Sequence, residues 1–91
     1  MNIFIEYCGA WNFLPQASRV EAELRTHYPD STIKLIEGGG GIFDVTCNGK
    51  LIYSKLNIQG RRFPNEGEIS KLIQQEKWFS LNSNEAKEKH P

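Results

Sequence analysis

The chain has 91 residues, which is enough for one domain and too few for a second hydrophobic core. It carries 11 Lys plus Arg against 11 Asp plus Glu, so its formal net charge is zero. This balance argues against nucleic-acid binding and against electrostatic attachment to an anionic membrane.

Two further classes of protein are disfavoured by the pattern of residues. No apolar run approaches the roughly 18 residues of a membrane span, and residues 1–8 lack the basic start and long apolar stretch of a signal peptide. The two cysteines, Cys8 and Cys47, are too few for a disulfide scaffold or a four-thiolate zinc site. We therefore expect a cytoplasmic protein without membrane contact.

The first part of the chain has the apolar pattern of a β-helix-β unit. Residues 2–7 are β-branched and aromatic, which predicts a strand, and residues 14–28 predict a helix with Pro15 in its first turn. Residues 32–37 predict a second strand, parallel to the first because a helical crossover joins them. The helix places its apolar stripe at Ala17, Val20, Leu24 and Tyr28, and its solvent-facing charges at Arg19, Glu21, Glu23 and Arg25.

The middle of the chain predicts an antiparallel hairpin. Residues 42–47 and 50–55 flank Asn48-Gly49, a dipeptide that favours two-residue hairpin turns because both positions need a positive φ. A two-residue turn pairs Val45 with Ile52. The face predicted to be buried then carries Phe43, Val45, Cys47 and Ile52.

A final helix follows a loop at residues 57–64. Asn65 with Glu68 three residues later resembles a helix N-cap, and Trp78 and Phe79 near the end of this helix are expected to cap the core. The element order is therefore β-α-β-β-β-α. This order predicts an α/β (α+β two-layer) fold with a four-stranded mixed sheet and two helices, which is the minimal thioredoxin-like arrangement.

We expect a single domain over residues 1–80 and a polar, disordered tail over residues 81–91.

The turn after the first strand is the most informative place for chemistry. Cys8 lies at the end of that strand, just before a helix whose first N–H groups have no partner within the helix. This position stabilises a thiolate, which is the nucleophile in thiol–disulfide exchange. The residue three positions on is Trp11, which has no redox chemistry, so spacing alone favours the interpretation that Cys8 is a small apolar residue in a turn.

Four segments together resemble the selenoprotein W family, also called Rdx. They are Tyr7-Cys-Gly-Ala10, the glycine stretch 38–41, the hairpin Phe43 to Lys55 with its Asn48-Gly-Lys-Leu-Ile segment, and the loop Gly60-Arg-Arg-Phe-Pro64. The resemblance covers residues 3–75. It implies a thioredoxin-like thiol oxidoreductase or antioxidant linked to glutathione, with a Cys-x-x-Cys or Cys-x-x-selenocysteine motif at the turn.

For the site, the resemblance implies that Cys8 is the surviving thiol and that Trp11 stands where the family has selenocysteine or cysteine. Gly9, Ala10 and Phe13 would shape the turn and access to it. We expect no bound cofactor and no metal. Glutathione is the possible co-substrate, glutathione or partner-protein thiols are the expected partners, and a monomer is favoured.

Two explanations are open for Trp11. A UGA codon, which encodes selenocysteine in a suitable messenger context, could have been read as Trp, or the gene could encode Trp. In either case this polypeptide cannot cycle as a two-residue redox centre. We expect Cys8 alone still to form a mixed disulfide with glutathione or with a partner thiol.

The remaining candidate residues have simpler interpretations. Cys47 shares the apolar face of the third strand and is expected to be core. The tetraglycine at residues 38–41 joins two strands, so it is a flexible connector that could lie beside the Cys8 turn and shape access to the thiol. Arg61 and Arg62 could bind an anion such as a glutathione carboxylate, but a solvated loop pair is favoured.

His27 and His90 are single histidines and support no metal site.

Two functions from different classes remain possible. The first is a selenoprotein W-like redox protein impaired at residue 11. The second is a thioredoxin-like interaction module without turnover, which docks onto a partner through an exposed turn at residues 8–13. Trp11, Asn12 and Phe13 give this second hypothesis its basis, because aromatic residues dominate the binding energy of many interfaces.

Overall fold

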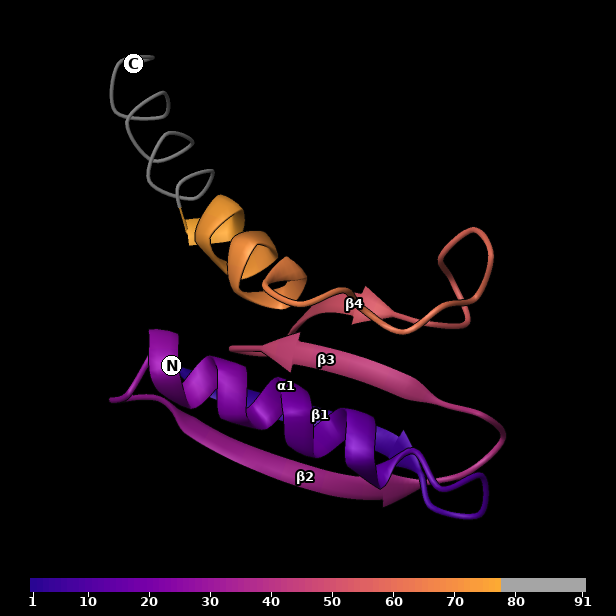
Figure 1. Cartoon of the computed structure of the whole chain (residues 1–91). Helices are drawn as coiled ribbons and strands as arrows, with labels where there is room; N and C mark the ends of the chain where they lie inside the picture. The colour runs from indigo at the N-terminus through magenta and orange to yellow at the C-terminus, as the bar shows by residue number, and fades with distance from the viewer. Residues whose placement is uncertain (78–91) are drawn as a thin grey trace.

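A computed structural model describes residues 1–77 (Figure 1). The helices and strands follow the predicted order β-α-β-β-β-α. They are β1 (Asn2–Cys8), α1 (Leu14–His27), β2 (Thr32–Gly38), β3 (Phe43–Cys47), β4 (Lys50–Ser54) and a second helix that starts at residue 68 and continues through residue 77 (the 68–77 helix). Within residues 1–77, no helix has both the length and the apolar character needed to cross a membrane.

Several predictions concern residues outside this range. Trp78 and Phe79 as core caps, His90, the domain boundary at residue 80 and the tail over residues 81–91 all lie outside the described residues.

The strands form one mixed sheet in the order β2-β1-β3-β4. β1 and β2 are parallel, as the helical crossover predicted, and β3 pairs antiparallel with both β1 and β4. In the hairpin turn, Asn48 has a φ of 52° and Gly49 a φ of 81°, which is the geometry that the Asn-Gly dipeptide predicted.

The hairpin between β3 and β4 contains a bulge. Next to the turn, Cys47 pairs with Lys50 and Thr46 with Leu51. The register then shifts, and Val45 pairs with Tyr53 instead of Ile52. The predicted pairing of Val45 with Ile52 is therefore wrong. A bulge sets two residues opposite one, so Tyr53 is buried at 4% exposure while Ile52 is only half-buried.

The hydrophobic core lies between one face of the sheet and the two helices. α1 contributes Ala17, Val20 and Leu24 of the predicted stripe, whereas Tyr28 follows the helix and is half-buried. The strands contribute alternate residues, as a sheet with one covered face requires. On the other face, Phe4 and Glu6 are half-buried and Lys34 is exposed. The core residues are Ile3, Ile5, Ala17, Val20, Leu24, Ile33, Phe43, Val45, Cys47, Tyr53, Ile69 and Ile73.

A carboxylate of α1 caps the 68–77 helix. The Glu23 carboxylate accepts hydrogen bonds from the N–H of Gly67 (2.7 Å), the N–H of Ser70 (3.2 Å) and the hydroxyl of Ser70 (2.8 Å). N–H groups at the start of a helix have no partner within the helix. The expectation that Glu23 faces solvent is therefore wrong: it is half-buried and joins the two helices.

The 68–77 helix also begins later than Asn65 predicted. The N–H of Asn65 donates to the Glu68 carboxylate at 2.8 Å, as in a capping box. Gly67 then adopts a φ of 81°, outside the helical range, and the first helical residue is Glu68. Asn65 is therefore not the N-cap, and the cap comes from Glu23.

Replacing Glu23 tests this cap. We expect Glu23→Ala to lower the free energy of unfolding by about 1–3 kcal/mol, because it leaves part-buried donors without acceptors. Urea unfolding measures the change. Glu21→Ala is the matched control: it removes only the Arg25 ion pair within α1, which contributes about 0.5 kcal/mol or less. Equal effects of the two substitutions would contradict the capping role.

Candidate functional site

The candidate site is the turn between β1 and α1, residues 8–13 (the Cys8 turn). The N–H of Cys8 donates to the carbonyl of Ile42 at 2.8 Å. The N–H of Gly9 donates to the carbonyl of Gly38 at 3.2 Å. These two bonds fix the start of the turn between the end of β2 and the segment that leads into β3.

The end of the turn is set by the start of α1. The N–H of Phe13 donates to the carbonyl of Cys8 at 3.1 Å, and Phe13 occupies the N-cap position without a side-chain cap. Asn12 has a φ of 58°, a conformation that Asn adopts more readily than most residues. Pro15 lies in the first turn, which contains no acidic residue. Cys8 therefore lies at the end of a strand and ahead of an uncapped helix start, as the sequence predicted.

Burial separates the two key residues of the turn. The Cys8 side chain is 0% exposed, whereas Trp11 is 61% exposed. Ala10 and Asn12 are also exposed. The expectation of a solvent-facing turn is thus confirmed for residues 10–12 and wrong for Cys8, whose side chain is fully buried.

Trp11 lies against the tetraglycine segment. A Cβ atom built on Gly41 would lie 2.5 Å from Cζ3 of the Trp11 ring, whereas one built on Gly40 would meet no atom within 4 Å. Gly41 is buried and has a φ of 79°. The prediction that the tetraglycine lies beside the Cys8 turn is therefore confirmed. Gly41 allows the indole ring to approach the backbone closely.

A row of aromatic rings connects the turn to the core. Ring centroids are 5.9 Å apart for Trp11 and Phe13, 4.7 Å for Phe13 and Phe63, and 5.3 Å for Phe63 and Phe43, all edge-to-face. The ammonium of Lys55 lies 5.4 Å from the centroids of both Phe13 and Phe63. The packing roles of Lys55 and Phe63 were not predicted from the sequence, because they depend on contacts with Phe13, 42 to 50 residues away in the chain.

Cys47 is core, as predicted. It is 8% exposed, and burial raises the pKa of its thiol. Its Cα partner on β1 is Ile3, whereas Cys8 is the last residue of the same strand. A strand rises about 3.3 Å per residue, so the two cysteines lie on the order of 17 Å apart along β1. That distance far exceeds the roughly 7 Å limit for a disulfide.

The arginine pair does not form a joint anion site. Arg62 makes two hydrogen bonds to the Glu68 carboxylate, at 2.8 and 2.9 Å. This pairing is the largest cause that lowers the pKa of Glu68 and raises the pKa of Arg62. Arg61 is exposed. Arg62, one of the two arginines considered for an anion site, is therefore already paired with a carboxylate of the same chain.

No group of three or more potential metal-ligating His, Cys, Asp or Glu side chains occurs in the part of the chain that the structure describes.

Comparison with known proteins places the chain in a family. Residues 2–75 match the Rdx family. The chain belongs to the Rdx family. Membership confirms the resemblance seen in the sequence, and it points to a thioredoxin-like, redox-related function for this Rdx protein.

Two relatives of this Rdx chain illustrate the family. Migration and invasion enhancer 1 of Mus musculus is 32% identical over 73 residues, which cover 80% of this chain and 62% of that protein. Selenoprotein W of Gallus gallus is 32% identical over 63 residues, which cover 66% of this chain and 74% of that protein. The chain thus spans less than two thirds of the migration and invasion enhancer relatives it matches.

Solved structures share the fold. The selenoprotein W-related protein of Vibrio cholerae has a TM-score of 0.73 and 24% identity, covering 81% of this chain and 92% of that one. A protein of Bordetella parapertussis has a TM-score of 0.70 and 23% identity, covering 82% and 95%. Over residues 1–77, the Rdx chain therefore has a thioredoxin-like α+β fold with two helices and a four-stranded mixed sheet.

Two alanine substitutions test the contact between Trp11 and the glycine segment. Gly40→Ala and Gly41→Ala both force a residue with a side chain into a positive φ, which costs about 1 kcal/mol. Only Gly41→Ala also displaces the indole ring. We expect Gly41→Ala to lower the free energy of unfolding further than Gly40→Ala does, by about 1 kcal/mol or more.

The two substitutions are measured by urea unfolding in the parent protein and in a Trp11→Ala background. The difference between them should disappear when the ring is absent. A difference that persists without Trp11 would contradict the contact.

Proposed function

We propose that this chain is a selenoprotein W-like thiol redox protein, linked to glutathione, whose centre is the Cys8 turn and whose second redox position is occupied by Trp11. One observation carries the proposal beyond family membership. Within the turn, residue 11 faces solvent at 61% exposure, whereas Cys8 is fully buried at 0%. The two positions of the motif therefore have different access to an external substrate.

This difference assigns a role to each position. A thiol or selenol at residue 11 would meet an oxidised substrate first and attack it. The covered thiol of Cys8 would then resolve the mixed intermediate from within the protein. Such an internal step is fast because it needs no second molecule. Trp11 removes the attacking group and leaves the resolving one.

The remaining chemistry uses Cys8 alone. When the turn opens, the Cys8 thiolate attacks the glutathione sulfur of a glutathionylated partner thiol, forms a mixed disulfide with glutathione and releases the partner thiolate. A glutathione thiolate then attacks the glutathione sulfur of the mixed disulfide, which regenerates the Cys8 thiolate and glutathione disulfide. Because the thiol is buried, the rate of this exchange depends on how often the turn opens.

The second candidate function is a docking module that uses the same turn without turnover. The exposed indole of Trp11 stands at the outer end of the aromatic row that reaches the fully buried Phe43. An aromatic side chain anchored in this way is typical of an interface hot spot. The covered thiol favours this candidate, because docking through Trp11 does not require Cys8 to react.

The origin of Trp11 bears on both candidates. A UGA codon at residue 11 would mean that the natural protein carries selenocysteine there, whereas a Trp codon would make the docking module the stronger candidate. The codon, read together with the mass of natively produced protein, distinguishes these origins.

Restoring a thiol at residue 11 tests the redox proposal. We expect Trp11→Cys to form an intramolecular disulfide with Cys8, seen as the loss of two hydrogens by intact mass. We also expect glutathione-dependent reduction of a small disulfide to rise at least about tenfold over the parent, since resolution becomes intramolecular.

Trp11→Ser is the matched control, because it removes the indole without adding a thiol, and it should stay at the parent rate. In Cys8→Ser combined with Trp11→Cys, the substrate should remain attached at residue 11. A folded Trp11→Cys variant that shows neither the disulfide nor the rate increase would contradict the redox proposal.

A further inference from the structure

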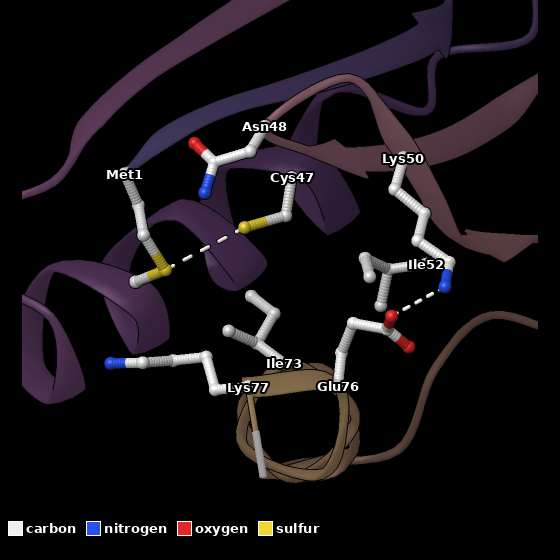
Figure 2. A pocket seen from close by; sticks show the side chains of 8 residues that line it. All are labelled: Met1, Cys47, Asn48, Lys50, Ile52, Ile73, Glu76 and Lys77. Carbon is white, nitrogen blue, oxygen red and sulfur yellow. Dashed lines mark hydrogen bonds and ion pairs between the residues drawn. The ribbon is translucent and has the colours of Figure 1, made fainter. Parts of the chain in front are cut away.

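A pocket lies at the opposite end of the sheet from the Cys8 turn (Figure 2). It has a volume of about 400 Å³. It opens beside the β3–β4 turn and is closed on one side by the 68–77 helix. The residues that line it are Met1, Cys47, Asn48, Lys50, Ile52, Ile73, Glu76 and Lys77.

The walls of this pocket are apolar. Met1, Ile52 and Ile73 supply aliphatic surface, and the thiol of Cys47 points into the same space (Figure 2). The Cys47 Sγ lies 3.6 Å from the Met1 Sδ. Ligand pockets commonly combine such a lining with a few polar groups that fix the orientation of the ligand.

The polar groups at the rim carry a net positive charge. Lys50 is paired with Glu76, so these two charges offset each other. The ammonium of Lys77 lies 5.8 Å from the centroid of the Tyr28 ring, and no carboxylate within residues 1–77 is in ion-pair distance of it. Two cations therefore lie beside an apolar cavity, the ammonium of Lys77 and the α-ammonium of Met1, and neither has an ion-pair partner within residues 1–77.

We propose that this pocket binds a small amphipathic carboxylate, with its alkyl chain against Met1, Ile52 and Ile73 and its carboxylate at Lys77. The size fits such a ligand. One water molecule occupies about 30 Å³ of liquid, so 400 Å³ corresponds to on the order of a dozen non-hydrogen atoms. The apolar walls would hold the chain, and the cation at the rim selects an acid over the corresponding alcohol.

Binding at this pocket is separate from the proposed redox function. The pocket contains Cys47 and not Cys8, and the two lie at opposite ends of β1. The chain has only two cysteines, so Cys47 is the single thiol in a Cys8→Ser variant. The reactivity of that thiol reports directly on whether the pocket is occupied.

Octanoate is the probe. In the full-length Cys8→Ser protein, the rate at which iodoacetamide alkylates Cys47 is measured by intact mass at increasing octanoate concentration. We expect octanoate at ten times its dissociation constant to slow alkylation about tenfold, because a bound chain covers the thiol. Octanol tests the role of the charge, and it should protect with an affinity at least about threefold weaker.

Substitutions test whether the probes bind in this pocket. We expect Lys77→Gln to weaken octanoate about two- to fivefold and to leave octanol unchanged. Lys34→Gln is the matched control, since Lys34 is exposed on β2 and lies outside the pocket. Ile52→Trp fills the half-buried side of the cavity and should abolish protection by both probes, with folding checked by circular dichroism.

Three results would overturn the proposal. They are a Cys47 alkylation rate that does not change with octanoate, equal protection by octanol and octanoate, and equal effects of Lys77→Gln and Lys34→Gln. Because every measurement uses protein without Cys8, none of these results bears on the redox function of the turn.

Discussion

Backbone hydrogen bonding at the carboxyl end of β1 determines the geometry of the whole candidate site. The Cys8 N–H is held by the Ile42 carbonyl, and the Gly9 N–H by the Gly38 carbonyl. These bonds tie the strand end to β2 and to the segment that leads into β3. Within the turn that follows, the side chain of Cys8 is fully buried, whereas that of Trp11 is 61% exposed. Glycine at residue 41 then lets the Trp11 ring pack on the segment.

The difference in burial between Cys8 and Trp11 connects the fold to the chemistry that we propose. A thioredoxin-like turn that exposes one motif position and buries the other would divide the proposed reaction between them. The exposed group would attack the substrate, and the buried thiol would resolve the mixed intermediate. In this chain the presented position is an indole, anchored through Phe13 and Phe63 to the core residue Phe43. The same anchoring that would hold a reactive group rigidly also suits an aromatic residue to a protein interface. The redox and docking proposals therefore share one structural cause.

Local patterns in the sequence were sufficient for the element order, because each strand and α1 has its own apolar period and Asn48-Gly49 encodes its turn. Features that depend on distant partners were not predictable. Glu23 caps a helix 44 to 47 residues away, and the backbone of Cys8 is held by Ile42, 34 residues further along the chain. The bulge was hidden because residues 51–53 are all apolar, so their alternation indicates no register. Of the candidate site, the position of Cys8 was predictable and its accessibility was not.

The accessibility of Cys8 is the quantity that tests the account most directly. In a Cys47→Ser variant Cys8 is the only thiol, and its alkylation by iodoacetamide can be timed in native buffer and in urea. The account predicts a native rate more than about tenfold below the denatured rate, because reaction must wait for the turn to open at a cost above about 1.4 kcal/mol. A native rate equal to the denatured rate would show that Cys8 is not covered, and the division of roles between the two positions would be contradicted.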